Sequence, residues 1–148
     1  MQISDTKAVI TGAASGLGEA TARHFASLGA HVTLLDRDTE RGKLVAEDIN
    51  GTFVETDVTD EASVKTAIQT ATSTMGGINA AVNCAGIAPA SKTVGRDGAH
   101  PLGLFRKTID INLVGSFNVA RLAAEAMTEN TPEADGARGV IINTASIA

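Results

Sequence analysis

Short apolar runs alternate along this chain with longer segments of mixed polar and apolar residues. Five runs have the length of a typical strand, and they lie at residues 8–11, 31–36, 53–56, 78–83 and 140–143. Apolar residues are nearly continuous in these runs, rather than occupying every second position. This pattern is typical of strands that are buried on both faces of a sheet, so we predict buried strands.

The segments between the runs predict helices, because their apolar and small residues recur at close to 3.6 positions. Gly29 is placed to end the first helix, and Asp60 is placed to cap the third. The predicted helices span residues 16–28, 39–49, 61–75 and 104–127. Residues 86–103 have no period and contain two prolines, which predicts a loop that is functional or mobile.

Strands that alternate with helices predict a doubly wound α/β fold around a parallel sheet. With right-handed crossovers the five strands take the order 3-2-1-4-5, which is that of a Rossmann dinucleotide-binding fold. We treat residues 1–148 as one such domain. The run at 140–143 would form an edge strand whose outer side nothing covers, so we expect an incomplete domain whose C-terminal strands and helices are missing.

Three glycines follow the first predicted strand and lead into the first helix. Gly12 allows a sharp turn, Gly16 allows a pyrophosphate to approach the backbone, and Gly18 allows the helix to lie close to the sheet. The N–H groups and positive dipole end of the helix would then face the phosphates. Glycines also mark ordinary turns, so the strand before and the helix after this loop carry the prediction.

Asp36 ends the second predicted strand. A carboxylate at this position can accept hydrogen bonds from both hydroxyls of an adenosine ribose, and it would repel a 2′-phosphate. This favours NAD over NADP as the cofactor, although Arg37 follows directly. The alternative is an ordinary turn with a solvated carboxylate.

Composition and charge exclude several other classes of protein. The net charge is −5 and no cluster of Lys or Arg is present, which argues against nucleic acid as a partner. No run approaches the 18 or so apolar residues of a membrane span. The single cysteine fits a reducing compartment, so we expect a cytoplasmic location. The three histidines are scattered, so we expect no metal site.

Taken together, these motifs resemble those of the short-chain dehydrogenase/reductase family. The resemblance covers essentially the whole chain. Two segments, at residues 83–93 and 139–146, are similar to the branch that acts on 3-hydroxyacyl-CoA and hydroxysteroid substrates. The matching motifs are the glycine loop Thr11–Gly18, Asp36, Asp57-Val58, Asn83-Cys84-Ala85-Gly86, Asn112 and Ser146.

The resemblance implies a role for each motif. Ser15 and Leu17 would contact the region of the cofactor pyrophosphate, and Asp57 and Val58 would contact the adenine. Cys84, Ala85 and Gly86 would line the nicotinamide ribose. The implied catalytic residues are Asn112, which would support a proton-relay water, and Ser146, which would bind the substrate oxygen. The implied reaction is NAD-dependent interconversion of a secondary alcohol and a ketone, in a homodimer or homotetramer that uses the long helix.

One departure from the family pattern is large. The family's catalytic pair has the form Tyr-x-x-x-Lys, and this chain contains no tyrosine. We therefore expect the cofactor-binding part of a dehydrogenase, inactive by itself. The alternative is a dinucleotide-binding module without catalysis. A methyltransferase with a similar sheet is disfavoured, because it would leave the phosphate loop and residues 83–86 unexplained.

Three of these residues have plainer alternative interpretations. Cys84 could be a nucleophile, but no histidine is placed to activate it. Asn112 lies where helix propensity disfavours it, so we expect a tertiary partner, and a purely structural role is as good an explanation as a catalytic one. Ser146 could be a polar residue that closes a strand.

Overall fold

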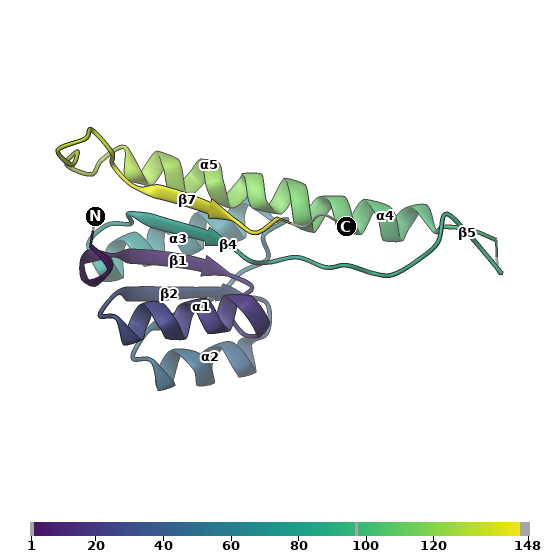
Figure 1. Ribbon diagram of the computed structural model, residues 1–148, viewed down its shortest axis with the longest axis horizontal. Coiled ribbons are helices and arrows are strands. Elements are labelled where there is room, and N and C mark those ends of the chain that lie inside the picture. Colours follow the sequence, from purple (N-terminus) through teal and green to yellow (C-terminus); the bar gives the residue numbers. More distant parts are fainter. Residues whose placement is uncertain (1, 97, 146–148) are drawn as a thin grey trace.

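The computed structural model describes residues 2–96 and 98–145 of the chain. Its centre is a parallel sheet of five strands in the order β3-β2-β1-β4-β7 (Figure 1). The strands are β1 (Lys7–Thr11), β2 (His31–Asp36), β3 (Thr52–Glu55), β4 (Ala80–Asn83) and β7 (Val140–Asn143). The predicted strand order and the doubly wound fold class are therefore confirmed.

Helices cover the two faces of this sheet. They are α1 (Gly16–Ser27), α2 (Thr39–Asp48), α3 (Glu61–Met75) and α5 (Ser116–Met127), and a further helix, α4 (Leu102–Ile109), lies beyond the sheet. Asp60 caps α3 as predicted, accepting a hydrogen bond from the Ala62 N–H at 3.0 Å. A short 3₁₀ helix, η1 (Ile3–Asp5), precedes β1.

The core consists of one apolar layer on each face of the sheet. Val9 of β1 belongs to the layer under α3 and α5, together with Val64 and Val119. Ile10, the next residue of β1, belongs to the layer under α1 and α2, together with Ala22. Burial of successive residues on opposite faces explains why the central strands are apolar throughout.

The strands are in register, so their carboxyl ends meet at one edge of the sheet. Thr11 of β1 pairs with Leu35 of β2 on one side and with Asn83 of β4 on the other. Asp36 pairs in turn with Glu55 of β3. This alignment brings the segments that follow four strands together, and they form the site described below.

The long helix predicted at 104–127 is not a single α-helix. It begins at Leu102, and a π-helical segment, η2 (Asp110–Gly115), separates α4 from α5. Within the segment predicted as a loop, β5 (Val94–Gly95) and β6 (Gly98–Ala99) pair as two short antiparallel strands. These strands and α4 form an arm that extends away from the sheet (Figure 1).

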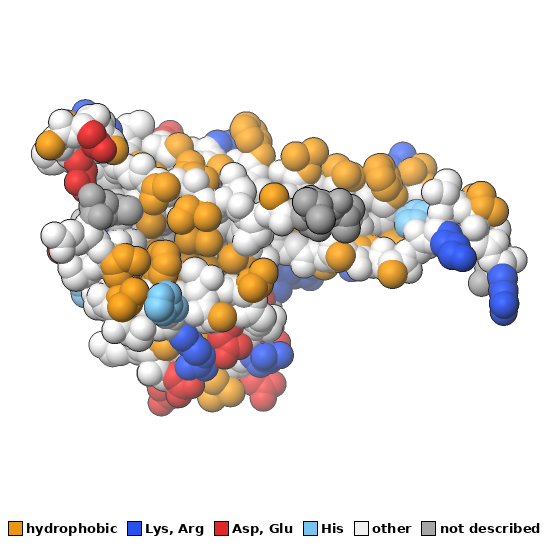
Figure 2. All heavy atoms as spheres, viewed as in Figure 1, with side chains coloured by type: hydrophobic (Ala, Val, Ile, Leu, Met, Phe, Trp, Pro, Cys, Tyr) orange, Lys and Arg blue, Asp and Glu red, His pale blue; other side chains and the backbone are white. Residues whose placement is uncertain are grey.

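The prediction that residues 140–143 are buried on both faces is wrong for this structure. Ile141 packs against the core, whereas Val140 and Ile142 are 38% and 42% exposed. They border a small apolar groove beside Ile3 and Phe25, and no helix in the described part of the chain covers them. Exposed apolar side chains also run along the arm and α5 (Figure 2).

Candidate functional site

A groove of about 460 Å³ lies at the carboxyl edge of the sheet. Segments that follow β1, β2, β3 and β4 line it, and η2 and α4 contribute one residue each. It brings together all eleven residues that the sequence predicts to bind a cofactor: Gly12, Ser15, Gly16, Leu17, Gly18, Asp36, Asp57, Val58, Cys84, Ala85 and Gly86.

Two of the loop glycines are needed because backbone approaches closely. Gly12 has φ +65°, and a Cβ there would lie 2.9 Å from the Ala85 nitrogen. A Cβ on Gly18 would lie 2.2 Å from the carbonyl oxygen of Gly12. Gly18 therefore lets α1 lie directly on the loop that follows β1, whereas the sequence predicted close contact with the sheet, and Gly12 lets the loop lie against the segment that follows β4.

Gly16 differs from these two, because a Cβ there would meet no heavy atom within 4 Å. Its φ is +55°, and it lies at the first position of α1, beside exposed Leu17. The residue before it, Ser15, occupies the N-cap position in extended conformation and makes no side-chain capping bond. The N–H groups of the first turn are thus not capped by a side chain, which leaves them available to an anion.

Thr11 joins the ends of β1 and β4. Its buried hydroxyl accepts hydrogen bonds from the N–H groups of Cys84 and Ala85, at 3.1 and 3.0 Å. These bonds fix the segment 84–86 against the glycine loop. The sequence shows Thr11 at the strand end, but nothing in the pattern indicates that it binds two backbone groups in the segment that follows β4.

Asp36 makes contacts that the sequence did not predict. One carboxylate oxygen, Oδ2, accepts a hydrogen bond from the N–H of Ala14, within the glycine loop, at 2.9 Å. The other, Oδ1, accepts from the N–H of Asp38 at 2.9 Å. The half-buried side chain therefore connects the loops that follow β1 and β2 while it lines the groove.

Asp57 is held in its ionised form. The hydroxyl and N–H of Thr59 both donate to its Oδ1, at 2.7 and 3.0 Å, and these bonds hold the pKa of the Asp57 carboxyl below its usual range. Arg37, whose Nε lies 3.6 Å from Oδ2, contributes further in the same direction. The arginine that could have accommodated a 2′-phosphate is thus turned toward a carboxylate.

Val58 is positioned by α5 and η2. The Asn118 amide donates to the carbonyl oxygen of Val58 at 3.0 Å, and a Cβ on Gly115 would lie 2.6 Å from the Val58 side chain. The contact therefore requires glycine at position 115. Through this contact the π-helical segment packs against Val58, which lines the groove.

The tertiary partner predicted for Asn112 is found. Its side-chain oxygen accepts from the N–H of Ile87 at 2.9 Å, and its amide donates to the carbonyl of Ile87 at 2.8 Å. Asn112 lies in η2, and a Cβ added to Gly86 would lie 3.4 Å from its side-chain oxygen. The observed bonds are those of a structural brace for the segment that follows β4. The role in proton relay stays a prediction.

Cys84 lacks the features of a reactive nucleophile. Its half-buried position raises the pKa of the thiol above its ordinary value, and this outweighs the opposing effect of a hydrogen bond with Thr21. A thiol with a raised pKa stays protonated near neutral pH. Cys84 is therefore a small residue that lines the groove.

Several lining residues escaped sequence reasoning. They are Leu35, Thr56, Ile87, Lys107 and Ile111. The first three are adjacent in sequence to predicted residues, so their position at the ends of the strands could have indicated that they line the groove. Lys107 and Ile111 reach the groove from the far helix, and only the helical spacing of four between them hints at a shared face.

The other catalytic prediction, Ser146, lies outside the described residues. Within residues 2–96 and 98–145, no group of three or more His, Cys, Asp or Glu side chains is arranged to hold a metal ion. In the same ranges no helix has the length and apolar character needed to cross a bilayer.

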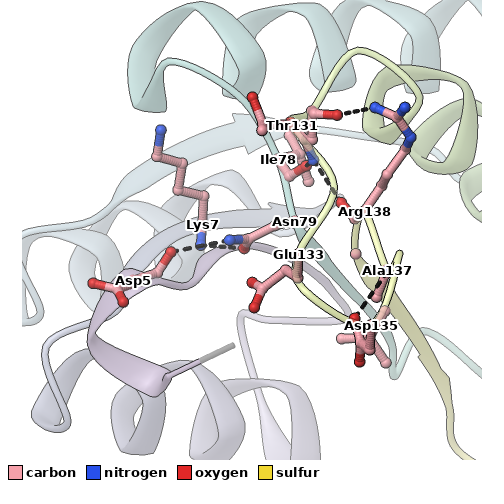
Figure 3. Close-up of a pocket in the computed structure, with 12 residues that line it drawn as sticks. Asp5, Lys7, Ile78, Asn79, Thr131, Glu133, Asp135, Ala137 and Arg138 are labelled. Atoms are coloured by element: carbon pink, nitrogen blue, oxygen red, sulfur yellow. Dashed lines mark hydrogen bonds between the residues drawn. The ribbon is translucent and has the colours of Figure 1, made fainter.

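A second cavity, of about 340 Å³, lies at the opposite edge of the sheet (Figure 3). Its polar groups bind mainly backbone: Lys7 donates its Nζ to Gly76, and Asn130 donates to the carbonyls of Ile78 and Arg138. Asn79 accepts from the Lys7 N–H and donates to Asp5. These bonds tie the connection between α5 and β7 to the start of β1.

Comparison with known proteins agrees with this geometry. Residues 6–148 match the family model for short chain dehydrogenases. The chain is 47% identical to the 3-hydroxyacyl-CoA dehydrogenase type-2 of Drosophila melanogaster, over 99% of this chain and 59% of that protein. It is 48% identical to the protein of the same name from Homo sapiens, over 95% of this chain and 56% of that one.

A solved structure is similar as well. The crystal structure of 3-hydroxyacyl-CoA dehydrogenase type-2 from Mycobacterium avium matches with a TM-score of 0.87 and 41% identity, over 95% of this chain and 56% of that one. The chain thus spans somewhat more than half the length of the relatives it matches. The family match, the identities and the shared fold together show that this chain belongs to the short-chain dehydrogenase family.

Proposed function

We propose that this chain provides the NAD-binding part of an oxidoreductase that interconverts a secondary alcohol and a ketone. The observation that carries the proposal is the convergence of eleven predicted residues, from four strand ends, on one groove. The names of the relatives support a 3-hydroxyacyl-CoA as the substrate, and a hydroxysteroid is the second candidate from the sequence resemblance.

The groove fits a dinucleotide along its length. Asp36 and Asp57 offer carboxylates at the ends of β2 and β3, where an adenosine would lie. The space at Gly16 and the uncapped first turn of α1 suit a pyrophosphate. Small residues at 84–86 leave room for the nicotinamide ribose beyond it. The bound nicotinamide would supply the hydride chemistry.

The described residues contribute binding and orientation rather than proton transfer. Asn112 is hydrogen-bonded to Ile87, and Thr11 is hydrogen-bonded to Cys84 and Ala85. These bonds fix the backbone that lines the proposed nicotinamide end of the groove. Proton exchange with the substrate hydroxyl requires a group of suitable pKa. The chain contains no tyrosine, so the phenol expected from the family resemblance is not among these 148 residues.

The test is a titration with NADH and NADPH, followed by nicotinamide fluorescence. We expect NADH to bind more tightly than NADPH, because Asp36 would repel a 2′-phosphate and Arg37 is turned toward Asp57. Absence of binding by either dinucleotide would overturn the proposal. Equal affinities would remove only the preference for NAD.

A non-catalytic dinucleotide-binding module is the alternative. Intact mass and turnover separate the two. A purified protein of 15.1 kDa that binds NADH without oxidising a 3-hydroxyacyl-CoA or a hydroxysteroid would be a binding module. A larger protein that turns over one of these substrates would be the proposed dehydrogenase.

We further propose that the protein is a homodimer or homotetramer that associates through the long helix. Supporting this, Phe105, Leu113 and Phe117 are 54%, 62% and 66% exposed along α4, η2 and α5. Sedimentation of the Phe117→Glu variant should show a smaller assembly than the parent protein. A parent protein that is monomeric would overturn this part. The cytoplasmic location stays a prediction from the cysteine content.

A further inference from the structure

We infer that Asp36 is a positioning residue for the phosphate-binding loop, in addition to its proposed contact with the adenosine ribose. This inference rests on the proposed dinucleotide site. The feature that carries it is the hydrogen bond from the Ala14 N–H to Asp36 Oδ2, at 2.9 Å. One carboxylate would thus serve two parts of the dinucleotide: it would contact the adenosine ribose, and it holds the loop that would bind the pyrophosphate.

The bond satisfies a group that has no easy alternative. Ala13 and Ala14 are 0% and 1% exposed, so water does not readily replace the carboxylate. A buried N–H without an acceptor is strongly disfavoured, so the loop keeps this path only while an acceptor stands at the end of β2.

Asp36 is itself held firmly. Its Oδ1 accepts from the Asp38 N–H, and its carbonyl accepts from the Thr56 N–H at 2.8 Å, which ties it to the end of β3. Asp38 in turn caps α2 by accepting from the Arg41 N–H. Asp36 lies in β2, so these bonds tie the acceptor that Ala14 uses to the neighbouring strand β3 and, through Asp38, to α2.

The loop has few other directional contacts near the phosphate position. Gly12 and Gly18 allow close packing, but they do not aim a polar group. Ser15 makes no capping bond, and Gly16 faces open space. The bond from the Ala14 N–H to Asp36 is therefore the side-chain hydrogen bond that holds the loop just before α1, two residues ahead of Gly16.

A carboxylate oxygen can accept more than one hydrogen bond, so holding Ala14 does not prevent Asp36 from binding ribose hydroxyls. Removal of the carboxylate therefore has two consequences: the ribose loses its acceptor, and the loop just before α1 loses the hydrogen bond that holds it. A residue that only recognised ribose would have the first effect alone.

Amide hydrogen exchange in the ligand-free protein tests the loop directly. Asp36→Ala should raise the exchange rate of the Ala14 amide at least tenfold relative to that of Ile10 in the core. Asp36→Asn, which keeps one acceptor oxygen, should raise it less, and it serves if the alanine variant does not fold. Asp57→Ala is the matched control, because Asp57 lines the groove without a bond to the loop, and it should leave Ala14 unchanged.

Ligand binding provides a second readout that a purely structural role would not change. Adenosine carries the ribose without phosphate, whereas ADP-ribose carries both. Asp36→Ala should weaken ADP-ribose at least tenfold more than adenosine, measured by NMR titration. Equal losses for the two ligands, or an unchanged exchange rate at Ala14, would overturn the inference. If the parent protein bound neither ligand, the proposed function would fail, while the exchange result would still decide the role of Asp36 in the loop.

Discussion

The two sides of the groove are built differently. The glycine-loop side comprises residues 11–18, 36–38 and 56–60. Here glycines allow backbone segments to pack closely against one another, and carboxylates accept hydrogen bonds from backbone N–H groups. On the arm side, which comprises residues 86–115, large apolar side chains such as Leu102 and Leu113 are exposed. The geometry that would bind the cofactor is thus determined by the chain itself, whereas the arm presents a surface that suits a further contact.

The largest effect should come from the tightest glycine. Gly18→Ala places a Cβ 2.2 Å from a backbone oxygen, so α1 must move, and we expect a loss of about 3 kcal/mol in the free energy of unfolding. Gly103→Ala on the arm is the control, since nothing lies within 4 Å of its Cβ, and it should be neutral or stabilising by up to about 1 kcal/mol. Urea unfolding measures both. Similar losses in the two variants would remove the contrast between the sides.

A second pair of glycines separates backbone strain from binding. Gly16 and Gly98 both have positive φ and open space around a Cβ, but only Gly16 lines the groove. Valine at either position should cost roughly 1–2 kcal/mol of stability. Only Gly16→Val should weaken NADH binding, by about 100-fold, because the side chain would occupy the space proposed for pyrophosphate. Normal binding by Gly16→Val would disprove the phosphate site.

The hydrogen bonds between Asn112 and Ile87, within the arm side, can be removed next. Asn112→Ala removes both bonds to Ile87, and we expect a loss of about 1 kcal/mol, with faster amide exchange at Ile87. Asn112→Asp keeps an acceptor for the N–H but no donor for the carbonyl, so its effect should be intermediate. If exchange at Ile87 did not change, the bonds would not be what holds this segment.

The smallest effect concerns a titration on the glycine-loop side. Thr59→Val removes the hydroxyl that donates to Asp57, so the pKa of this carboxyl should rise toward its ordinary value, as an NMR titration of its Cγ would show. The folded-state pKa lies below the unfolded one, so the contribution to stability is present above the unfolded pKa and disappears as the pH falls through the folded one. Since the side chain is 36% exposed, the variant should lose only a few tenths of a kcal/mol at pH 7, and no difference should remain below the folded-state pKa. A deficit that persisted in acid would point to lost packing instead.

The sequence predicted the parts of this structure that follow from local rules. Continuous apolar runs identify buried strands, and parallel strands align their carboxyl ends, so Asp36, Asp57 and residues 84–86 had to meet at one edge. The glycine spacing identified the turn between β1 and α1. Each of these inferences needs only the residues of one segment and the geometry of a parallel sheet.

Contacts between distant segments were not predictable in this way. The spacing of residues 104–127 is consistent with one α-helix, because a single extra residue per turn barely alters an apolar pattern. The bond from Asp36 to Ala14 depends on the exact path of a loop, which composition does not encode. The exposure of Val140 and Ile142 reflects what lies beside β7, and an apolar run by itself does not specify that.

The π-helical segment η2 determines where the arm points. A one-residue deletion between 110 and 115 that restored α-helical geometry would rotate α4 by about 100° relative to α5. Lys107 would leave the groove, and Phe105 would face a new direction, while every residue of the glycine loop stayed in place. A change in the length of the chain at this one turn would therefore reorient the arm while the glycine loop kept its position.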